Sequence, residues 1–349
     1  MSVDMLSAVL HGKNDLRLEH LPVPVAGRGQ LFIKVHTVGI CGTDMHFWQH
    51  GSMGSYIVKA PLVLGHESSG TVVALGEHTK GFKVGDKVAM DPSIPCKNCQ
   101  YCKTGRYNLC SKQMCFGMPP RNGAFTRYVV HDAEYCFKLP DSVSYEEGAL
   151  IEPLSCVVHA CKRAGMTVGE RVLILGAGPI GLLCMMVAQA NGATSIVVTD
   201  VNDARLSIAK ELGAQHTVNV KGLSIDEVRT KIHEALGTAP DVSFECSGAT
   251  TAIETGITTT RSGGVVALVG LGSDRAELPI IDGAIREVDI RGTFRQANCY
   301  PTAIDLVASK RVDLSRLTRA HYKLEQTLEA FQVSSTLDVS LFLTNKHES

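Results

Sequence analysis

Four cysteines lie close together in the stretch PCKNCQYCKTGRYNLC, spaced C-x2-C-x2-C-x7-C. Gaps of two residues let neighbouring thiolates turn toward one centre, and four thiolates suit zinc or an iron–sulfur cluster. The alternative, two disulfides or scattered buried thiols, is disfavoured in a reducing compartment. Nothing else suggests one-electron chemistry, so zinc is favoured. Four thiolates fill its coordination shell, which predicts a structural zinc held by Cys96, Cys99, Cys102 and Cys110.

A second group of metal-ligating residue types is spread more widely. Cys41 and His66 are good zinc ligands, and the carboxylates of Glu67 and Glu152 could complete a site. Neighbours on a regular strand point to opposite faces, so His66 and Glu67 reach one ion only if the backbone bends, which Gly65 permits. Without that bend, Glu152 is the better third ligand; it lies in the apolar run ALIEPLS, where an unpaired carboxylate is costly. Three protein ligands and one open position predict a catalytic zinc.

The segment GAGPIG places Gly176, Gly178 and Gly181 in the pattern G-x-G-x-x-G. It follows the apolar strand RVLIL and opens a helix, which is the context that a dinucleotide site requires. The first glycine makes the tight turn, the second lets the backbone approach the pyrophosphate, and the third lets helix and strand pack closely. The helix N-terminus supplies N–H groups for the phosphates.

Asp200 ends the next strand, 24 residues after Gly176. A carboxylate there accepts hydrogen bonds from both ribose hydroxyls and repels a 2′-phosphate, so the sequence predicts NAD rather than NADP. Arg205 lies close by and could cover the adenine or meet a phosphate.

The secondary structure that must position these groups changes in type along the chain. Up to about residue 150, the runs LFIKVHTVGI, GTVVALG, KVGDKVAM and FTRYVV are separated by turn residues, which is typical of a small barrel-like all-β domain. Helical periodicity begins near Ser144, where Glu147 completes a capping box.

From Glu170 onward, strands and helices alternate, which predicts a doubly wound α/β domain over residues 155–295. Asn191-Gly192 ends the first helix, and Asn202 or Asp203 caps the second. The expected strands are 171–175, 195–200, 241–248, 265–272 and 289–295, and the expected helices are 182–191, 204–213, 227–237, 251–264 and, after this domain, 300–312.

Composition limits the partners of the chain. It has 349 residues, is 44% hydrophobic, and carries a net charge of −1, so there is no general attraction to nucleic acid or to an anionic membrane. No apolar run approaches the ~18 residues that cross a bilayer. The N-terminus does not resemble a secretory signal, so a cytoplasmic protein is expected. Cysteines outside the two metal groups, such as Cys136, Cys184 and Cys246, are interpreted as plain buried thiols.

From about residue 6 to about residue 330, the chain strongly resembles the zinc-dependent medium-chain alcohol dehydrogenases, specifically the sorbitol (polyol) dehydrogenases. The resemblance implies a GroES-like catalytic domain, residues 1–154 plus 296–349, with the structural zinc lobe at about 92–112 and a Rossmann domain, 155–295, inserted. It also implies a homo-oligomer, either a dimer or a tetramer. The motifs that carry it are CGTDMH, GHESSGTV, GDKVAMDPSIPC, the four-cysteine lobe, EPLS, GAGPIG, VTD and TFR.

The same resemblance assigns roles by position. The catalytic zinc ligands would be Cys41, His66 and Glu67, with a water held by Glu152. Besides the glycines, cofactor contacts are expected at Ile180, Asp200, Arg205, Val269, Gly270, Leu271, Thr293, Phe294 and Arg295. Substrate contacts are expected at Phe47, Glu152, Arg295 and Gln296.

The implied reaction moves hydride reversibly from a secondary hydroxyl of a sorbitol-like polyol to NAD and gives a ketose. The proton leaves through the water at Glu152, or through Thr43 and then His46. Arg295 either binds a distal hydroxyl or forms a structural ion pair. Two rivals remain: a ketose or acetoin-type reductase that uses NADPH, and a non-enzymatic zinc- and nucleotide-binding protein.

The chain also departs from the family pattern. Family members often have Tyr where this chain has Phe47 and Gln296, so two hydroxyls that could bind a polyol are missing. They often have Thr-Pro-Pro-Asp-Asp where this chain has Met-Pro-Pro-Arg-Asn at 118–122, and the stretch after Phe331 differs from their usual final basic strand.

Overall fold

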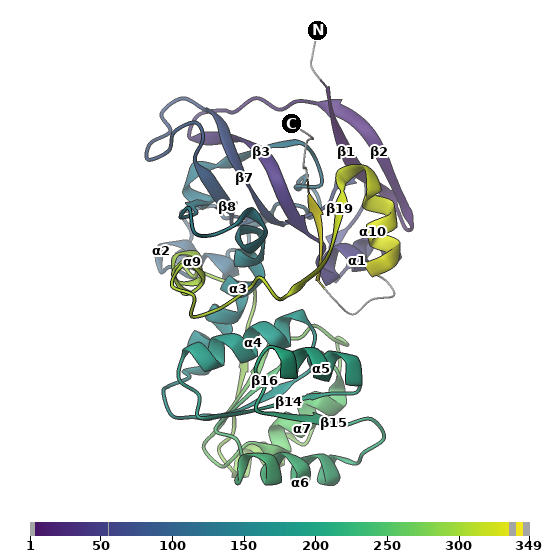
Figure 1. Ribbon diagram of the computed structural model, residues 1–349, viewed down its shortest axis with the longest axis vertical. Coiled ribbons are helices and arrows are strands. Elements are labelled where there is room, and N and C mark those ends of the chain that lie inside the picture. The colour runs from purple at the N-terminus through teal and green to yellow at the C-terminus, as the bar shows by residue number, and fades with distance from the viewer. Residues whose placement is uncertain (1–3, 55, 335–339, 345–349) are drawn as a thin grey trace. The chain divides into compact units, whose positions relative to one another are not determined.

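The computed structural model describes residues 4–54, 56–334 and 340–344. It divides into two compact units, one formed by residues 1–152 and 300–349 and the other by residues 153–299. Both ends of the chain therefore contribute to the first unit, and the second is one continuous segment (Figure 1). Within the divergent C-terminal stretch, residues 335–339 and 345–349 lie outside the described residues.

The main sheet of the first unit has the order β12-β8-β7-β3-β20-β19. Its central strand β3 (Gln30–Gly39) also pairs with β11 (Tyr128–Asp132). Leu31, Ile33 and Val35 are fully buried, because alternate residues of a strand share one face and that face covers the core. The other strands are β7 (Glu67–Leu75), β8 (Lys87–Met90), β12 (Cys136–Lys138), β19 (Thr318–Lys323) and β20 (Ser340–Thr344).

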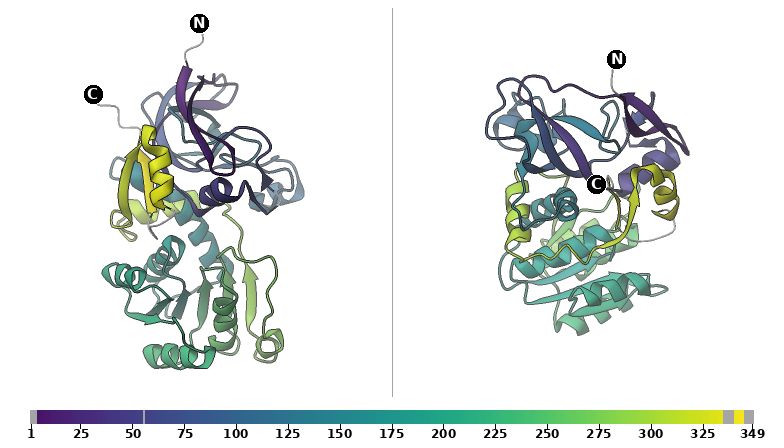
Figure 2. Two further views of the ribbon diagram at one scale, coloured as in Figure 1. Left: turned by 90° about the vertical axis from the view of Figure 1, so that its right-hand side faces the viewer. Right: turned by 45° about the horizontal axis from the view of Figure 1, so that its top comes forward.

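Smaller elements complete this unit. The C-terminal segment lies beside the N-terminal one (Figures 1 and 2), and the ring of Phe331 packs edge-on against Trp48 and Phe125. The strands are β1 (Asp4–Gly12), β2 (Asp15–Pro22), β4 (Ser52–Met53), β5 (Tyr56–Ile57), β6 (Leu62–Val63), β9 (Ser93–Ile94) and β10 (Met114–Cys115). The helices are α1 (Gly42–His50), α2 (Gln100–Lys103), α9 (Tyr300–Ala308) and α10 (Thr327–Ser334).

The chain passes from the first unit to the second within α3 (Tyr145–Ala164). The backbone N–H of Ser144 donates to Glu147 Oε2 at 2.8 Å, and the N–H of Glu147 donates to Ser144 Oγ at 3.1 Å. This reciprocal pair confirms the predicted capping box. Among the described residues, no helix is both long and apolar enough to span a membrane.

The second unit is built on a parallel sheet of order β15-β14-β13-β16-β17-β18. Helices cover both of its faces (Figures 1 and 2). This confirms the predicted doubly wound α/β fold. The strands are β13 (Arg171–Leu175), β14 (Ser195–Asp200), β15 (His216–Asn219), β16 (Val242–Glu245), β17 (Val265–Leu268) and β18 (Asp289–Gly292), and the helices are α4 (Pro179–Ala190), α5 (Asp203–Glu211), α6 (Ile225–Leu236), α7 (Thr250–Thr259) and α8 (Ile280–Ile285).

Several local features of this unit differ from the sequence-based expectation, including the ends of β16 and β17, which lie at Glu245 and Leu268 and not at 248 and 272. The edge strand β15 was not expected, because its four residues, HTVN, are too few and too polar to show a period. Helix α8 was not expected either. The last strand ends at Gly292, three residues before the expected end, and Arg295 has φ +50, outside the range of a strand.

Candidate zinc and dinucleotide sites

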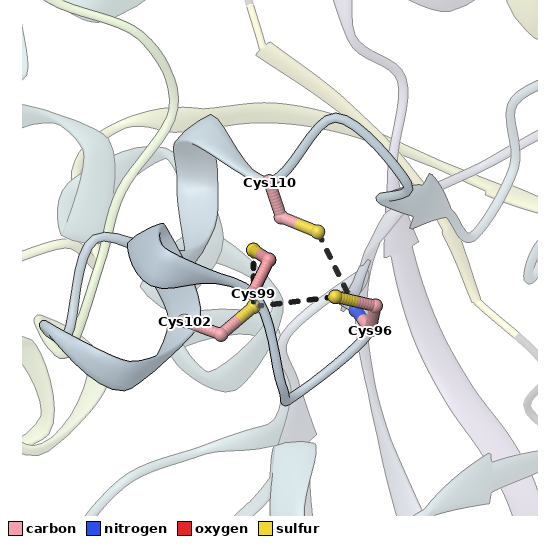
Figure 3. A group of neighbouring side chains, drawn as sticks. All are labelled: Cys96, Cys99, Cys102 and Cys110. Atoms are coloured by element: carbon pink, nitrogen blue, oxygen red, sulfur yellow. Dashed lines mark hydrogen bonds between the residues drawn. The ribbon is translucent and has the colours of Figure 1, made fainter.

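The four cysteines of the lobe converge on one point in the first unit (Figure 3). Their sulfur atoms all lie within 4.8 Å of one another. Cys102 Sγ is 3.5 Å from Cys99 Sγ and 4.0 Å from Cys96 Sγ. Tetrahedral zinc with Zn–S bonds of about 2.3 Å holds its sulfur ligands about 3.8 Å apart, so the arrangement fits zinc.

Electrostatics also favours a cation in this lobe. Hydrogen bonds from the backbone of Asn98 and Cys99 lower the pKa of the Cys96 thiol to about 6. Burial and contacts with the neighbouring thiols raise the pKa of the Cys102 thiol to about 12. The four sulfurs therefore cannot all be anionic near neutral pH unless a metal ion compensates their charge.

A second cluster is formed by Cys41, just before α1, and by His66 and Glu67 at the start of β7. One ligand atom of each lies within 4.8 Å of the other two. The backbone bends at Gly65, which has φ +90, so His66 precedes the strand and its neighbour begins it. A Cβ at Gly65 would lie 2.9 Å from the ring of Phe125, which leaves room there only for glycine.

Space for the Glu67 side chain comes from a glycine on the adjacent strand. Gly39 of β3 pairs directly with Glu67. A Cβ at Gly39 would lie 2.2 Å from Glu67 Oε2, so any larger residue would displace the carboxylate. This role of Gly39 was not predicted, because the contact depends on the pairing of β3 with β7.

Asp44 joins the two chain segments that carry these ligands. It is fully buried in the first turn of α1. Its Oδ2 accepts from the Cys41 N–H at 3.0 Å, its Oδ1 accepts from the Gly65 N–H at 3.1 Å, and Oδ1 lies 3.5 Å from His66 Nδ1. This role of Asp44 was not predicted, although an acidic residue at the third helical position is a capping signal.

Burial of these ligands favours a bound cation, because it raises the free energy of their anionic forms. Burial raises the pKa of the Cys41 thiol to about 11, and the Glu67 carboxylate adds to this shift. Burial and the charge of Glu152 raise the pKa of Glu67 to about 8. Sulfur, imidazole and carboxylate ligands together are typical of zinc. Glu152, on α3 and 9% exposed, is close enough to act on Glu67 but is not among the three grouped ligand residues.

The other residues expected to act in the first unit lie along α1. Thr43 is half-buried and His46 is exposed, with its ring centroid 5.5 Å from that of His50. Phe47 has no exposed surface and packs in the hydrophobic core. The expected contact of Phe47 with substrate stays a prediction.

In the second unit, the glycine-rich turn follows β13. Gly176 has φ +107, which favours glycine. A Cβ at Gly181 would lie 1.8 Å from Gly176 O, whereas a Cβ at Gly178 would meet nothing within 4 Å. Helix α4 then begins at Pro179 with no side-chain cap, and Ile180 is half-buried in its first turn. The open space at Gly178 and the uncapped helix start fit a bound pyrophosphate.

Asp200 ends β14 with its carboxylate held in place. Its Oδ2 accepts from the Ala177 N–H at 2.8 Å and its Oδ1 accepts from the Asn202 N–H at 2.9 Å. Arg205 Nη1 lies 3.6 Å from Asp200 Oδ2. Asn202, not Asp203, caps α5, since its side chain accepts from the N–H groups of that helix.

The other expected cofactor residues follow β17 and β18. The N–H groups of Val269 and Gly270 both donate to Glu245 O at 2.8 Å, and Leu271 is largely exposed. Thr293 Oγ1 donates to Leu268 O at 2.8 Å. These segments come after the carboxyl ends of parallel strands, where open α/β sheets bind ligands.

The remaining residues that are expected to bind cofactor or substrate come directly after Thr293 in the chain. Phe294 is 44% exposed, and Arg295 Cζ lies 5.0 Å from the centroid of its ring. Gln296 is buried, and its Oε1 accepts from the Cys299 N–H at 3.1 Å. Its amide therefore has a structural hydrogen bond in this unit.

Fold and site together define an oxidoreductase class with a β-rich zinc-binding unit and a dinucleotide-binding unit. Residues 27–141 match the alcohol dehydrogenase GroES-like domain, and residues 179–309 match the zinc-binding dehydrogenase domain. The chain belongs to the zinc-containing medium-chain alcohol dehydrogenase family, which confirms the resemblance noted in its sequence.

Three relatives illustrate this membership. Sorbitol dehydrogenase from Gallus gallus is 49% identical over 329 residues, which cover 94% of this chain and 93% of the relative. The structure of L-idonate 5-dehydrogenase from Escherichia coli has a TM-score of 0.89 and 33% identity, and 99% of each chain is covered. The structure of 2R,3R-butanediol dehydrogenase from Bacillus subtilis has a TM-score of 0.91 and 31% identity, covering 98% of this chain and 100% of that one.

Proposed function

We propose that this chain reversibly oxidises a secondary hydroxyl of a sorbitol-like polyol to a ketone, with zinc and NAD as cofactors. The observation that carries the proposal is the cluster of Cys41, His66 and Glu67, whose three ligand atoms lie within 4.8 Å of one another. Three protein ligands leave a fourth position for a substrate oxygen. The 49% identity to a sorbitol dehydrogenase supports the polyol as substrate class.

When bound, zinc supplies a Lewis acid that polarises the hydroxyl, and NAD supplies the hydride acceptor. Cys41, His66 and Glu67 would hold the metal, and Asp44 fixes the backbone at Cys41 and at Gly65. Glu152 receives the hydroxyl proton through a water molecule. Thr43 and His46, on the half-buried and exposed sides of α1, form a second route to solvent.

Changing Glu152 to Gln tests the proton route. The amide has the same shape but cannot take up a proton, so turnover should fall by about 10²- to 10⁴-fold. Zinc content and the dissociation constant of NAD should remain within about twofold of the wild-type values. Steady-state kinetics with sorbitol and metal analysis on the same sample measure these quantities.

The matched control is Glu146→Gln, which removes a carboxylate from the same helix. That side chain is 36% exposed and is joined to His321 by a 3.7 Å surface contact. It should keep full turnover. If Glu152→Gln turned over as fast as this control, Glu152 would have no catalytic role.

The second unit is proposed to bind NAD in preference to NADP, because Asp200 would repel a 2′-phosphate. Arg205 does not reverse this preference, since its guanidinium lies beside that carboxylate. Asp200→Ala should lower kcat/KM for NAD by about tenfold or more and reduce the discrimination against NADP. Asp203→Ala, at an exposed carboxylate three residues away, should change neither value.

Kinetics in both directions with NAD and NADP measure this preference. Equal use of NADP by the unaltered protein would favour the rival NADPH-dependent ketose or acetoin-type reductase. No reduction of either cofactor by any polyol or diol would favour the non-enzymatic rival.

We also propose that the protein is a cytoplasmic homo-oligomer, either a dimer or a tetramer. Among the described residues, β18 is the last strand of its sheet and has no neighbouring strand on one side. Ile281 and Ile285 of α8 are 75% and 78% exposed, and Ile290 of β18 is 38% exposed. Exposed apolar side chains beside an edge strand favour an interface between copies. Light scattering on the purified protein measures the assembly.

A further inference from the structure

Two cysteines outside both zinc clusters lie in contact in the second unit. Cys184 is fully buried on α4, and Cys246 directly follows β16 and is half-buried. Their sulfur atoms are 3.6 Å apart, although the residues are 62 positions apart in the chain. The sequence indicated plain buried thiols, whereas the fold brings the two together as a pair.

This pair lies next to the segments that are expected to bind the dinucleotide. The N–H of Cys246 donates to Leu175 O at 2.8 Å, just before the glycine-rich turn. A Cβ at Gly176 would lie 3.4 Å from the Cys246 carbonyl carbon, and a Cβ at Gly270 would lie 2.9 Å from it. The main chain of Cys246 is therefore packed against the first glycine of the turn and against the segment after β17. Cys184 lies on the helix that the turn opens.

We propose that Cys184 and Cys246 form a reversible disulfide on exposure to a peroxide, and that this bond weakens NAD binding. The inference rests on the proposed function of the second unit as an NAD site. It assigns to that site a redox control that the zinc chemistry does not require.

The order of the two steps follows from exposure and charge. Cys246 has accessible surface and meets the oxidant first. Contact with Cys246 raises the pKa of the Cys184 thiol, and burial adds to the effect, so Cys184 keeps its proton until the second step.

The chemistry balances with hydrogen peroxide as the oxidant. The Cys246 sulfur, as its thiolate, attacks peroxide; an S–O bond forms, the O–O bond breaks, and hydroxide leaves to become water. The Cys184 sulfur then attacks the sulfenic sulfur; the S–S bond forms, the S–O bond breaks, and the Cys184 proton leaves with the hydroxyl group as a second water. The two thiols lose two electrons and two protons in total, and peroxide is reduced to two waters.

We expect bond formation to shift the backbone next to the dinucleotide turn. The sulfur atoms must approach from 3.6 Å to about 2.05 Å. Protein interiors are close-packed and transmit such displacements, and the Cys246 carbonyl carbon lies 3.4 Å from the position of a Cβ at Gly176 and 2.9 Å from that of a Cβ at Gly270. We expect the dissociation constant of NAD to rise about tenfold, which is about 1.4 kcal/mol of binding free energy.

The test uses the full-length, zinc-loaded protein and hydrogen peroxide added in stoichiometric steps. Peptide mass spectrometry should find a 184–246 cross-link with the loss of two hydrogens, and calorimetry should find the weaker NAD binding. Dithiothreitol should reverse both changes. Zinc content is measured in parallel, because peroxide also oxidises cysteines that bind metal.

Cys184→Ser should bind NAD normally before treatment and show no reversible weakening after it. Cys184→Ala is a second variant if the serine form does not fold. Cys161→Ser, at another buried thiol of the same unit, is the matched control and should respond as the unaltered protein does.

Three results would overturn the inference: no 184–246 cross-link, a cross-link with unchanged NAD affinity, or equal weakening in Cys184→Ser. Failure of the proposed function would look different. In that case the untreated protein would not bind NAD, while mass spectrometry would still detect the 184–246 cross-link.

Discussion

Replacing Cys41 with serine should remove the zinc of the Cys41–His66–Glu67 cluster and reduce turnover by at least about 10³-fold. A serine hydroxyl is a poor substitute for a thiolate ligand, and the two remaining ligands do not make a stable site. The lost Lewis acid contributes several kcal/mol to the barrier, and about 4 kcal/mol corresponds to a thousandfold change in rate. The zinc content should fall from two ions per chain to one, as measured by metal analysis. Steady-state kinetics with sorbitol and NAD should show the loss of turnover.

The dinucleotide site should be unaffected in this variant, because its residues lie on the second unit and Cys41 belongs to the first. NAD affinity measured by calorimetry should therefore stay within about twofold of the original value. Cys115→Ser is the matched control: this buried thiol of the same unit belongs to neither metal cluster and lies 3.6 Å from Phe116 O. It should retain two zinc ions. Two zinc ions and near-normal turnover in Cys41→Ser would refute the catalytic assignment.

Replacing Cys99 with serine should instead remove the lobe zinc and lower the unfolding temperature by at least about 10 °C. Residues 97–106 are exposed or half-buried, so this segment has little apolar packing of its own. Structural zinc in small domains contributes about 10–16 kcal/mol of apparent binding free energy, and loss of even about 5 kcal/mol gives a shift of this size. Thermal unfolding followed by circular dichroism and metal analysis of the same sample measure both effects.

Lys97→Ala provides the control within the lobe. Lys97 Nζ lies 3.3 Å from Asp132 and 2.8 Å from Glu134 in partly exposed ion pairs. Such pairs contribute at most about 1 kcal/mol, so this variant should keep both zinc ions and unfold within about 2 to 4 °C of the original. If Cys99→Ser still carried two zinc ions per chain, the lobe would not be a metal site. The Cys41 and Cys99 variants should each keep the zinc that the other loses.

Features carried by neighbouring residues could be predicted from the sequence. The lobe cysteines lie within fifteen positions of chain, so their spacing alone implied that the sulfurs converge. The capping box at Ser144 and the G-x-G-x-x-G turn are equally local, and the alternation of strands and helices sufficed for the fold class of the second unit. The strand β15 was missed, since four residues at a sheet edge need no apolar pattern to pair.

Contacts between distant segments required the tertiary structure. The sequence left Glu67 and Glu152 as alternative third ligands; the fold groups Glu67 with Cys41 and His66 because of the bend at Gly65 and the space beside Gly39. Asp44 became visible as a link between chain segments only once both were placed.

The sequence by itself determined the class of fold, the lobe that can take a metal and the dinucleotide turn, because each depends on the periodicity or spacing of residues close together in the chain. The tertiary structure alone decided which carboxylate joins Cys41 and His66, and that Cys184 meets Cys246. The physical reason is that these contacts depend on how separate strands and helices pack. The residues next to a side chain in the sequence do not indicate which distant segment will pack against it.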